Sequence, residues 1–95
     1  MSHFVYILYS SSHDKFYIGE TKDLTLRLKF HNEISKSSYT RPYRPWVLFF
    51  SLQVENRSVG RQIEKYLKKK PRSFLSRLPN DTDLIDWIIN KFIVG

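Results

Sequence analysis

Two strand-forming runs near the start of the chain most constrain its fold, Phe4–Tyr9 (FVYILY) and Phe16–Thr21 (FYIGET). Both runs are dense in aromatic and β-branched residues, which favour strands, and the polar Ser10–Lys15 between them has the composition of a turn. Together they predict an antiparallel hairpin. We expect either that Tyr9 pairs with Phe16 or that the hairpin closes in a two-residue turn at His13-Asp14.

Either register places Tyr6, Tyr17 and Gly19 on one face of the hairpin, because side chains alternate between faces along a strand. In the register that pairs Tyr9 with Phe16, Gly19 lies directly opposite Tyr6. A glycine leaves room where a side chain would otherwise stand. We therefore expect a ligand to approach the backbone at Gly19, beside two phenols.

The next segment predicts a helix that begins after Asp23, a residue type that caps helix N-termini, and ends near Asn32. Arg27 and His31 are four residues apart and so lie on the same face of this helix. We expect that face to meet the sheet. An arginine there points into the protein or into a cleft, and burying its charge without a partner is costly.

The middle of the chain predicts a loop followed by a third strand. The loop, Glu33–Arg44, is rich in serine and other polar residues, whereas Trp46–Leu52 (WVLFFSL) is an almost unbroken apolar run. Because this run shows little alternation, we expect the strand to be covered on both faces or to lie at the centre of the sheet.

A second helix is predicted after the third strand. Asn56 or Ser58 can cap its start, and it ends at Lys70 because Pro71 cannot continue it. The apolar stripe that would bury this helix consists of Val59, Ile63, Tyr66 and Leu67.

The end of the chain predicts a short helical turn over Ser73–Leu78 and a final helix over Asn80–Phe92. The broad apolar face within Leu84–Phe92 most simply completes the core. The alternative is that it docks a partner, which would make the protein an adaptor.

Composition narrows the class of partner. The 95 residues carry a formal net charge of +7 and contain no cysteine. Surplus positive charge favours a polyanion, either nucleic acid or an anionic membrane surface. The lack of cysteine excludes disulfides, thiolate metal sites and a cysteine nucleophile. With no secretory signal and no apolar run near the roughly 20 residues that span a bilayer, we expect a cytoplasmic single domain over residues 1–95 with no membrane segment.

An ordered series of motifs runs through these segments. The series consists of Val5-Tyr6-Ile7, Tyr17-Ile18-Gly19, Arg27-Leu28-x-x-His31-Asn32, Tyr39-Thr40 and Glu64. With this series the chain resembles the GIY-YIG nuclease superfamily, in particular small stand-alone bacterial members similar to the N-terminal cleavage domain of the excinuclease C subunit. The motif-bearing part covers about residues 4–70, and 71–95 would be a helical completion. The chain departs from the family pattern at Val5, which is usually glycine, and in Glu33–Ser38, which lacks the glycines often found there.

The resemblance implies an α+β fold in which helices flank a three-stranded antiparallel sheet, in the order β-β-α-β-α-α. It also implies an endonuclease that hydrolyses phosphodiester bonds in DNA with one divalent ion, Mg²⁺ or Mn²⁺, and a place in DNA repair or recombination. The catalytic residues carried over by the resemblance are Tyr6, Tyr17, Arg27, His31 and Glu64, with Glu64 as the metal ligand. We expect the phenols, the guanidinium and the carboxylate to line one solvent-open hollow.

The chemistry of phosphodiester hydrolysis suits these residue types. The guanidinium of Arg27 can hold two phosphate oxygens at once, and Glu64 offers the hard oxygen ligand that Mg²⁺ prefers. Tyr17 is the candidate general base, although a phenol with a pKa of about 10 needs positive charge nearby to lose its proton at neutral pH. Tyr6 would orient the water or the phosphate. His31 could share the base role, since its ordinary pKa of about 6.5 is closer to neutral pH.

A further set of cations is predicted to contact nucleic acid. These residues are Lys22, Lys36, Arg41, Arg44, Lys68, Lys69 and Arg72. Tyr39 and Tyr43 are interleaved with three of them, a pattern that suits a nucleic-acid strand. A solvated loop is an equally good interpretation of that segment, and Glu64 could simply pair with Lys68, four residues on.

The alternative function is a nucleic-acid-binding module of the same fold that does not cut. In either case the partner would be DNA, which could be branched or otherwise structured. A chain of this size has no room for a separate targeting domain, so a protein partner or a homo-oligomer could supply targeting.

Overall fold

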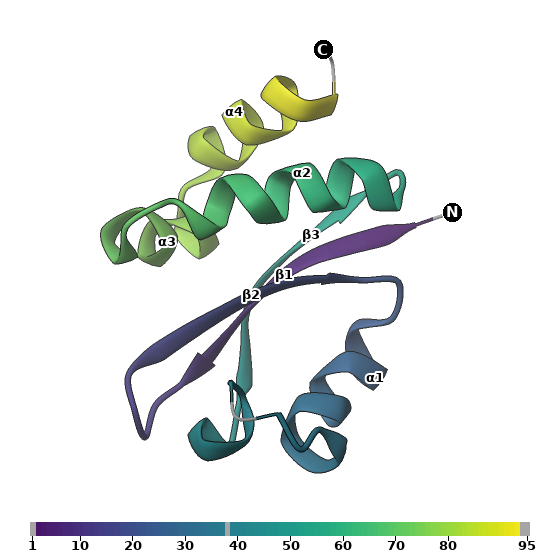
Figure 1. Ribbon diagram of the computed structural model, residues 1–95. Coiled ribbons are helices and arrows are strands. Elements are labelled where there is room, and N and C mark those ends of the chain that lie inside the picture. Colours follow the sequence, from purple (N-terminus) through teal and green to yellow (C-terminus); the bar gives the residue numbers. More distant parts are fainter. Residues whose placement is uncertain (1, 38, 94–95) are drawn as a thin grey trace.

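The computed structural model describes residues 2–37 and 39–93. Strands β1 (His3–Ser10), β2 (Lys15–Thr21) and β3 (Val47–Val54) form one antiparallel sheet with β1 in the middle. Helix α1 (Leu24–Lys29) lies on one side of the sheet (Figure 1). Helices α2 (Arg57–Lys68), α3 (Arg72–Arg77) and α4 (Thr82–Ile93) lie on the other. The fold is the expected α+β arrangement. Along the chain, the short α3 comes between the two long helices α2 and α4.

The hairpin has the register that pairs Tyr9 with Phe16, so Tyr6 lies opposite Gly19 as expected. The alternative prediction, a two-residue turn at His13-Asp14, is wrong because the last paired residues are Ser10 and Lys15. Asp14 closes the connection with a φ of 51°, in the left-handed region that aspartate tolerates better than most residues. The hairpin thus fixes both tyrosines on one face of the sheet.

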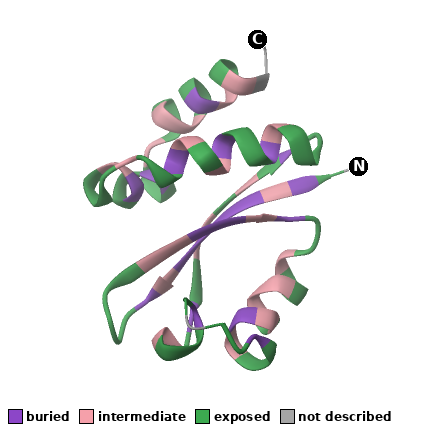
Figure 2. Ribbon diagram, in the orientation of Figure 1, coloured by how far each residue is buried: buried purple, intermediate pink, exposed green. Residues whose placement is uncertain are grey.

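Each face of the sheet carries its own apolar cluster. On the side of α2, α3 and α4, Val5 and Ile7 of β1 pack with Ile63 and Leu67 of α2. On the α1 side, Tyr6 and Leu8 pack with the buried Trp46 and with Tyr17, Leu24, Leu28 and Tyr43. Burial is greatest along β1 and on the sheet-facing side of α2 (Figure 2). The candidate tyrosines therefore belong to the thinner layer, which α1, the turn after it (Phe30–Ile34) and the chain around Trp46 cover.

β3 is an edge strand, so the expectation that it is central or covered on both faces is wrong. Its first residues, Val47 and Leu48, are 54% and 44% exposed. A continuous apolar run does not distinguish an edge from a centre, because neighbouring strands and not composition decide which strand is paired on both sides. β1 takes the central place because both β2 and β3 pair with it.

The predicted helix caps are confirmed. The Asp23 side chain accepts a hydrogen bond from the Leu26 amide at 3.0 Å, and the Asn56 side chain accepts one from Val59 at 3.0 Å. Helix α1 continues into a wider π-helical turn, Phe30–Ile34, so helical structure runs slightly past the predicted end at Asn32. Of the two residues expected to cap α2, it is Asn56 and not Ser58 that does so.

α4 completes the core on its side of the sheet. Ile88 is buried in the apolar cluster, and Leu84, Ile85 and Phe92 pack against it, whereas Trp87 remains 51% exposed. This agrees with the simpler of the two interpretations of the final helix. Among the helices of the described part of the chain, none combines the length and the apolar character needed to cross a bilayer.

Candidate active site

Tyr6 and Tyr17 come from adjacent strands and lie with their ring centroids 6.4 Å apart. Tyr6 is almost fully buried, and its ring covers Gly19. A Cβ atom at Gly19 would lie only 2.5 Å from Cζ of Tyr6 and would overlap its hydroxyl. The expected room for a ligand at Gly19 is therefore taken by the Tyr6 ring. The glycine serves the site by letting this ring lie flat against the backbone.

His31 lies in the π-helical turn that follows α1 and is 3% exposed. Its Nε2 atom is 3.0 Å from the hydroxyl of Tyr6, and its ring centroid is 4.7 Å from that of Tyr17. Burial, helped by the nearby charges of Arg27 and Arg44, lowers the pKa of His31 to about 4. The imidazole is therefore neutral at pH 7 and a weaker base than its ordinary pKa of about 6.5 implied, and its contact with Tyr6 orients that hydroxyl.

Arg27 is half-buried on α1, with Cζ 5.3 Å from the centroid of the Phe30 ring. No carboxylate of the described residues lies within ion-pair distance of its guanidinium. Its charge nevertheless lowers the pKa values of Tyr6, Tyr17 and His31, which places it within electrostatic reach of all three. An arginine in this position is free to bind an anion.

Both phenols are harder to ionise than tyrosine in water. Burial is the main cause that raises the pKa of Tyr6, followed by Tyr17, and Arg27 offsets only part of the rise. Burial and then the carboxylate of Glu64 raise the pKa of Tyr17, again against Arg27. Arg27 alone is therefore not the positive charge that would make Tyr17 a base, and additional positive charge is needed.

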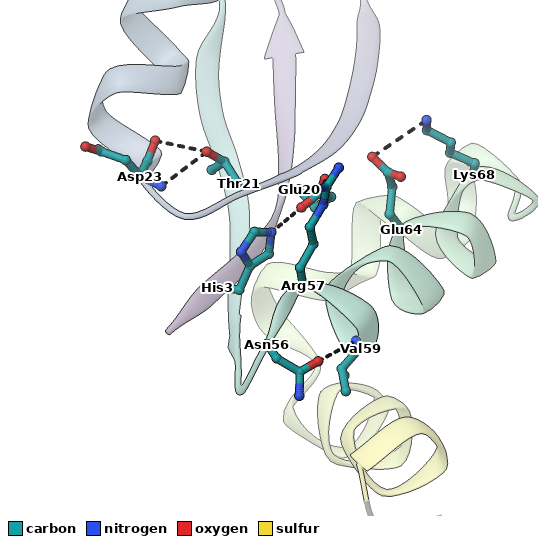
Figure 3. A network of polar contacts seen from close by, with 9 residues as sticks. All are labelled: His3, Glu20, Thr21, Asp23, Asn56, Arg57, Val59, Glu64 and Lys68. Atoms are coloured by element: carbon teal, nitrogen blue, oxygen red, sulfur yellow. Dashed lines mark hydrogen bonds and ion pairs between the residues drawn. The ribbon is translucent and has the colours of Figure 1, made fainter. Parts of the chain in front are cut away.

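Glu64 reaches the site from the opposite layer. It lies on α2, across the sheet from α1, yet its charge raises the pKa values of both tyrosines. Its side chain is 21% exposed and lies 3.7 Å from Nζ of Lys68 (Figure 3). Because α2 packs against both β1 and β2, it brings Glu64 within electrostatic reach of phenols from both strands.

Two hollows of the described surface contain candidate residues. Tyr6 and Arg27 line a small, mostly apolar hollow of about 100 Å³ with Leu24 and Leu28. Glu64 lines a shallower depression of about 400 Å³ on the outer side of α2, together with Lys65 and Lys68. The charges of Arg27 and Glu64 both act on the two phenols, so the four groups lie within electrostatic reach of one another.

The donor set fits a hard divalent cation. Glu64 offers carboxylate oxygens at a partly exposed position, and the phenols beside it lack enough positive charge to ionise. In residues 2–37 and 39–93, no group of three or more His, Cys, Asp or Glu side chains could hold a metal. An ion with one or two protein ligands that keeps several waters suits Mg²⁺ or Mn²⁺, whereas zinc would require more protein ligands.

The predicted nucleic-acid contacts fall into two groups. Lys22, Lys36, Arg41 and Lys69 are exposed. Arg44, Lys68 and Arg72 are engaged within the protein.

Two of the engaged arginines support the fold. Arg44 donates from Nε to the carbonyl of His31 at 2.6 Å and from Nη2 to the carbonyl of Ser35. Arg72 donates to the carbonyl and the carboxylate of Asp14, at 2.6 Å each. Arg44 thus holds the turn that carries His31, a role that its position in a polar loop did not indicate.

Sequence reasoning missed three residues near the site. His3 contacts the carboxylate of Glu20, and Arg57 lies 3.6 Å from the same carboxylate (Figure 3). Arg57 also begins a series of cations at four-residue spacing, Arg57, Arg61 and Lys65, on the exposed side of α2. The four-residue spacing of these cations is visible in the sequence and is the signal that predicts a basic face on this helix.

Comparison with known proteins agrees with this arrangement. Residues 2–77 match the family model described as the GIY-YIG catalytic domain. UPF0213 protein RBAM_000440 of Bacillus velezensis is 38% identical over 75% of this chain and 71% of its own length. UPF0213 protein YazA of Bacillus subtilis is 34% identical over the same shares.

A solved structure shows the same fold. The solution NMR structure of the UPF0213 protein BH0048 from Bacillus halodurans has a TM-score of 0.51 and 28% identity, covering 82% of each chain. The two strand motifs, the α1 arginine and the α2 glutamate all lie within the matched residues. The chain therefore belongs to the GIY-YIG family.

Proposed function

We propose that the protein is a divalent-metal-dependent endonuclease that hydrolyses phosphodiester bonds in DNA and acts in DNA repair or recombination. The observation that carries the proposal is the guanidinium of Arg27, which lies near Tyr6, Tyr17 and His31 without an ion-pair partner among the described residues. A phosphodiester supplies the anion that this arginine lacks. Membership of a nuclease family supports the same conclusion.

Arg27 would bind the scissile phosphate through two of its oxygens and stabilise the negative charge that grows on them during hydrolysis. Glu64 would hold the divalent ion. When bound, this ion supplies positive charge to the phosphate and acidifies water. Its charge would also lower the pKa values of Tyr6 and Tyr17, in opposition to the burial that raises them.

The two tyrosines would then divide the work. Tyr17, the less buried phenol, would lose its proton to solvent as its pKa falls, and its phenolate would then take a proton from the attacking water. Tyr6 would orient the water or the phosphate, since His31 fixes its hydroxyl at 3.0 Å. Neutral His31, which its pKa of about 4 makes a weak base at pH 7, would mainly hold that hydroxyl in place.

A non-cleaving DNA-binding module is the alternative function. Lys68 lies 3.7 Å from Glu64 and competes with a cation for that carboxylate, which favours this alternative. The depression that Glu64 lines also contains Lys65 and Lys69, so its surroundings are strongly basic.

A cleavage panel decides between the two functions. Purified wild-type protein is incubated with branched, nicked and single-stranded DNA in Mg²⁺ or Mn²⁺, beside Arg27→Ala, Glu64→Gln and the remote surface variant Lys91→Ala. The proposal expects cleavage by wild type and Lys91→Ala and its loss in the other two. A contaminating nuclease would cut in all four samples. Tight DNA binding by wild type without cleavage of any substrate would establish the binding module instead.

A further inference from the structure

A groove beside Arg27 has no part in the mechanism proposed above. It has a volume of about 470 Å³ and lies between the β2–α1 connection and the first turn of α2. This volume is in the range of sites that hold a small ligand. Arg27 lies at its wall, so whatever occupies the groove lies next to the group that Arg27 binds.

One part of the groove wall is cationic. Lys22 is exposed, and the side chain of Arg57 is 69% exposed. Arg57 is held only loosely, with Nε 3.6 Å from a carboxylate oxygen of Glu20, so most of its donors remain available (Figure 3). With Arg27, these residues offer three cations to an anion in the groove.

Another part of the wall is apolar. Leu26 is 58% exposed although it lies on the same short helix as Arg27, and the half-buried Phe30 follows one turn later. An exposed leucine and an aromatic ring beside cations suit a ligand that has both an apolar face and an anionic group. A nucleotide is such a ligand, because its base packs on apolar and aromatic surface while its phosphate binds cations.

We infer that this groove holds one unpaired nucleotide of the DNA substrate, adjacent to the scissile phosphate at Arg27. Its own phosphate lies between Lys22 and Arg57, and its base packs against Leu26 and Phe30. The inference rests on the proposed function, because it uses the strand that Arg27 binds. A base in the groove cannot remain paired in a duplex, so the protein prefers DNA with an unpaired nucleotide beside the cleavage position.

Glu20 opposes binding at this subsite. Its carboxylate contacts His3 and pairs with Arg57, which leaves negative charge beside the place for the phosphate. Asp23 also lines the groove, but its carboxylate caps α1. Replacing Glu20 with glutamine therefore strengthens binding of the unpaired nucleotide, whereas Arg57→Ala and Leu26→Glu weaken it.

The test measures binding by fluorescence anisotropy in EDTA, so that cleavage does not interfere. Two labelled DNAs of the same sequence are compared, one a continuous duplex and one with a single unpaired nucleotide. Variants Arg57→Ala, Leu26→Glu and Glu20→Gln are paired with charge-matched controls Lys91→Ala, Asn90→Asp and Asp86→Asn, which are exposed on α4 and outside the groove. Thermal unfolding verifies that each variant is folded.

Wild type is expected to bind the DNA with the unpaired nucleotide about tenfold more tightly than the duplex. Arg57→Ala and Leu26→Glu reduce this preference by about fivefold beyond their controls, and Glu20→Gln increases it. Equal binding of the two DNAs by wild type, or variants that behave like their controls, would overturn the inference. Failure of the proposed function looks different, since wild type would then cut neither DNA in Mg²⁺ or Mn²⁺ while the binding preference and its response to the variants remain.

Discussion

The ring of Tyr6 lies directly against the backbone of Gly19 on the neighbouring strand, in the space where any other residue would place its Cβ atom. The same ring presents its hydroxyl to His31 at 3.0 Å. The glycine of the second strand motif thus determines where the phenol of the first motif points. The two motifs form one unit, and a change in the glycine acts on the tyrosine.

Gly19→Ala is therefore expected to displace Tyr6 and break its contact with His31. The new Cβ atom would overlap the Tyr6 hydroxyl, so the buried ring must move, at a cost of about 1–3 kcal/mol in the free energy of unfolding. Urea denaturation and DNA cleavage measure the two effects. Gly60→Ala is the comparison variant: its Cβ would also crowd a side chain, the His3 ring at 3.0 Å, but less than at Gly19 and away from Tyr6, and alanine favours a helix. Equal losses in both variants would contradict this account.

The hydroxyls of the two tyrosines are expected to differ in what they contribute to stability. Tyr6→Phe leaves Nε2 of His31 buried without its partner and costs about 1–3 kcal/mol in the free energy of unfolding. The Tyr17 hydroxyl makes no hydrogen bond to a described side chain or backbone group, so Tyr17→Phe changes stability by about 0.5 kcal/mol or less. Both lose cleavage activity. If Tyr17→Phe retains wild-type activity, Tyr17 is not the base.

The pKa of His31 makes stability depend on pH. Its pKa falls from 6.5 to about 4 on folding, so between these values the unfolded chain binds more protons than the folded protein. The contribution of His31 to the free energy of unfolding is therefore fully present above about pH 6.5. It decreases by up to about 3 kcal/mol as the pH falls toward 4. His31→Gln removes this contribution, so its free energy of unfolding should fall less than that of wild type over the same range. Parallel curves for the two proteins would show that His31 titrates normally.

Much of the fold follows from local signals in the sequence. The hairpin with both tyrosines on one face, the caps at Asp23 and Asn56 and the apolar stripe of α2 each depend on residues close in the sequence, although the choice between the two expected hairpin registers does not follow from them. The position of β3 at the sheet edge does not follow from local signals, because it depends on which strands pair with β1. The sequence of Trp46–Leu52 does not indicate whether this strand is paired on one side or on both.

The site was predictable in its residue types but not in its geometry. The tyrosines share one face of the hairpin, and Arg27 and His31 are four residues apart on α1 and the helical turn that continues it, and both spacings are visible in the sequence. Glu64 lies in the other layer, and its distance from the phenols depends on how α2 packs across β1 and β2. The Tyr6 ring fills the space beside Gly19 because of the rotamer that this side chain adopts, and sequence spacing does not predict a rotamer.

Two arginines of the same loop are expected to have different functions. Arg44→Ala removes hydrogen bonds to the carbonyls of His31 and Ser35 and should lower the free energy of unfolding by about 2 kcal/mol. Arg41 is exposed, so Arg41→Ala should leave stability within about 0.5 kcal/mol of wild type. If Arg41 binds a phosphate, Arg41→Ala lowers DNA affinity. The slope of the logarithm of affinity against the logarithm of salt concentration then becomes shallower by about one. An unstable Arg41→Ala or a stable Arg44→Ala would reverse the assignment.

Lys68 is expected to weaken binding of the divalent ion at Glu64. Its ammonium group lies 3.7 Å from a Glu64 oxygen, and its side chain is 55% exposed. The ammonium group therefore repels a metal ion and competes with it for the carboxylate. Lys68→Ala should therefore bind Mn²⁺ about two- to fivefold more tightly than wild type, a modest effect because solvent screens the pair. Titration of free Mn²⁺ by electron paramagnetic resonance measures this directly. Lys69→Ala removes the same charge from the same depression without removing a partner of Glu64, and it should change Mn²⁺ affinity less. Glu64→Gln should abolish the specific binding altogether, and wild-type Mn²⁺ affinity in that variant would mean that the ion is held elsewhere.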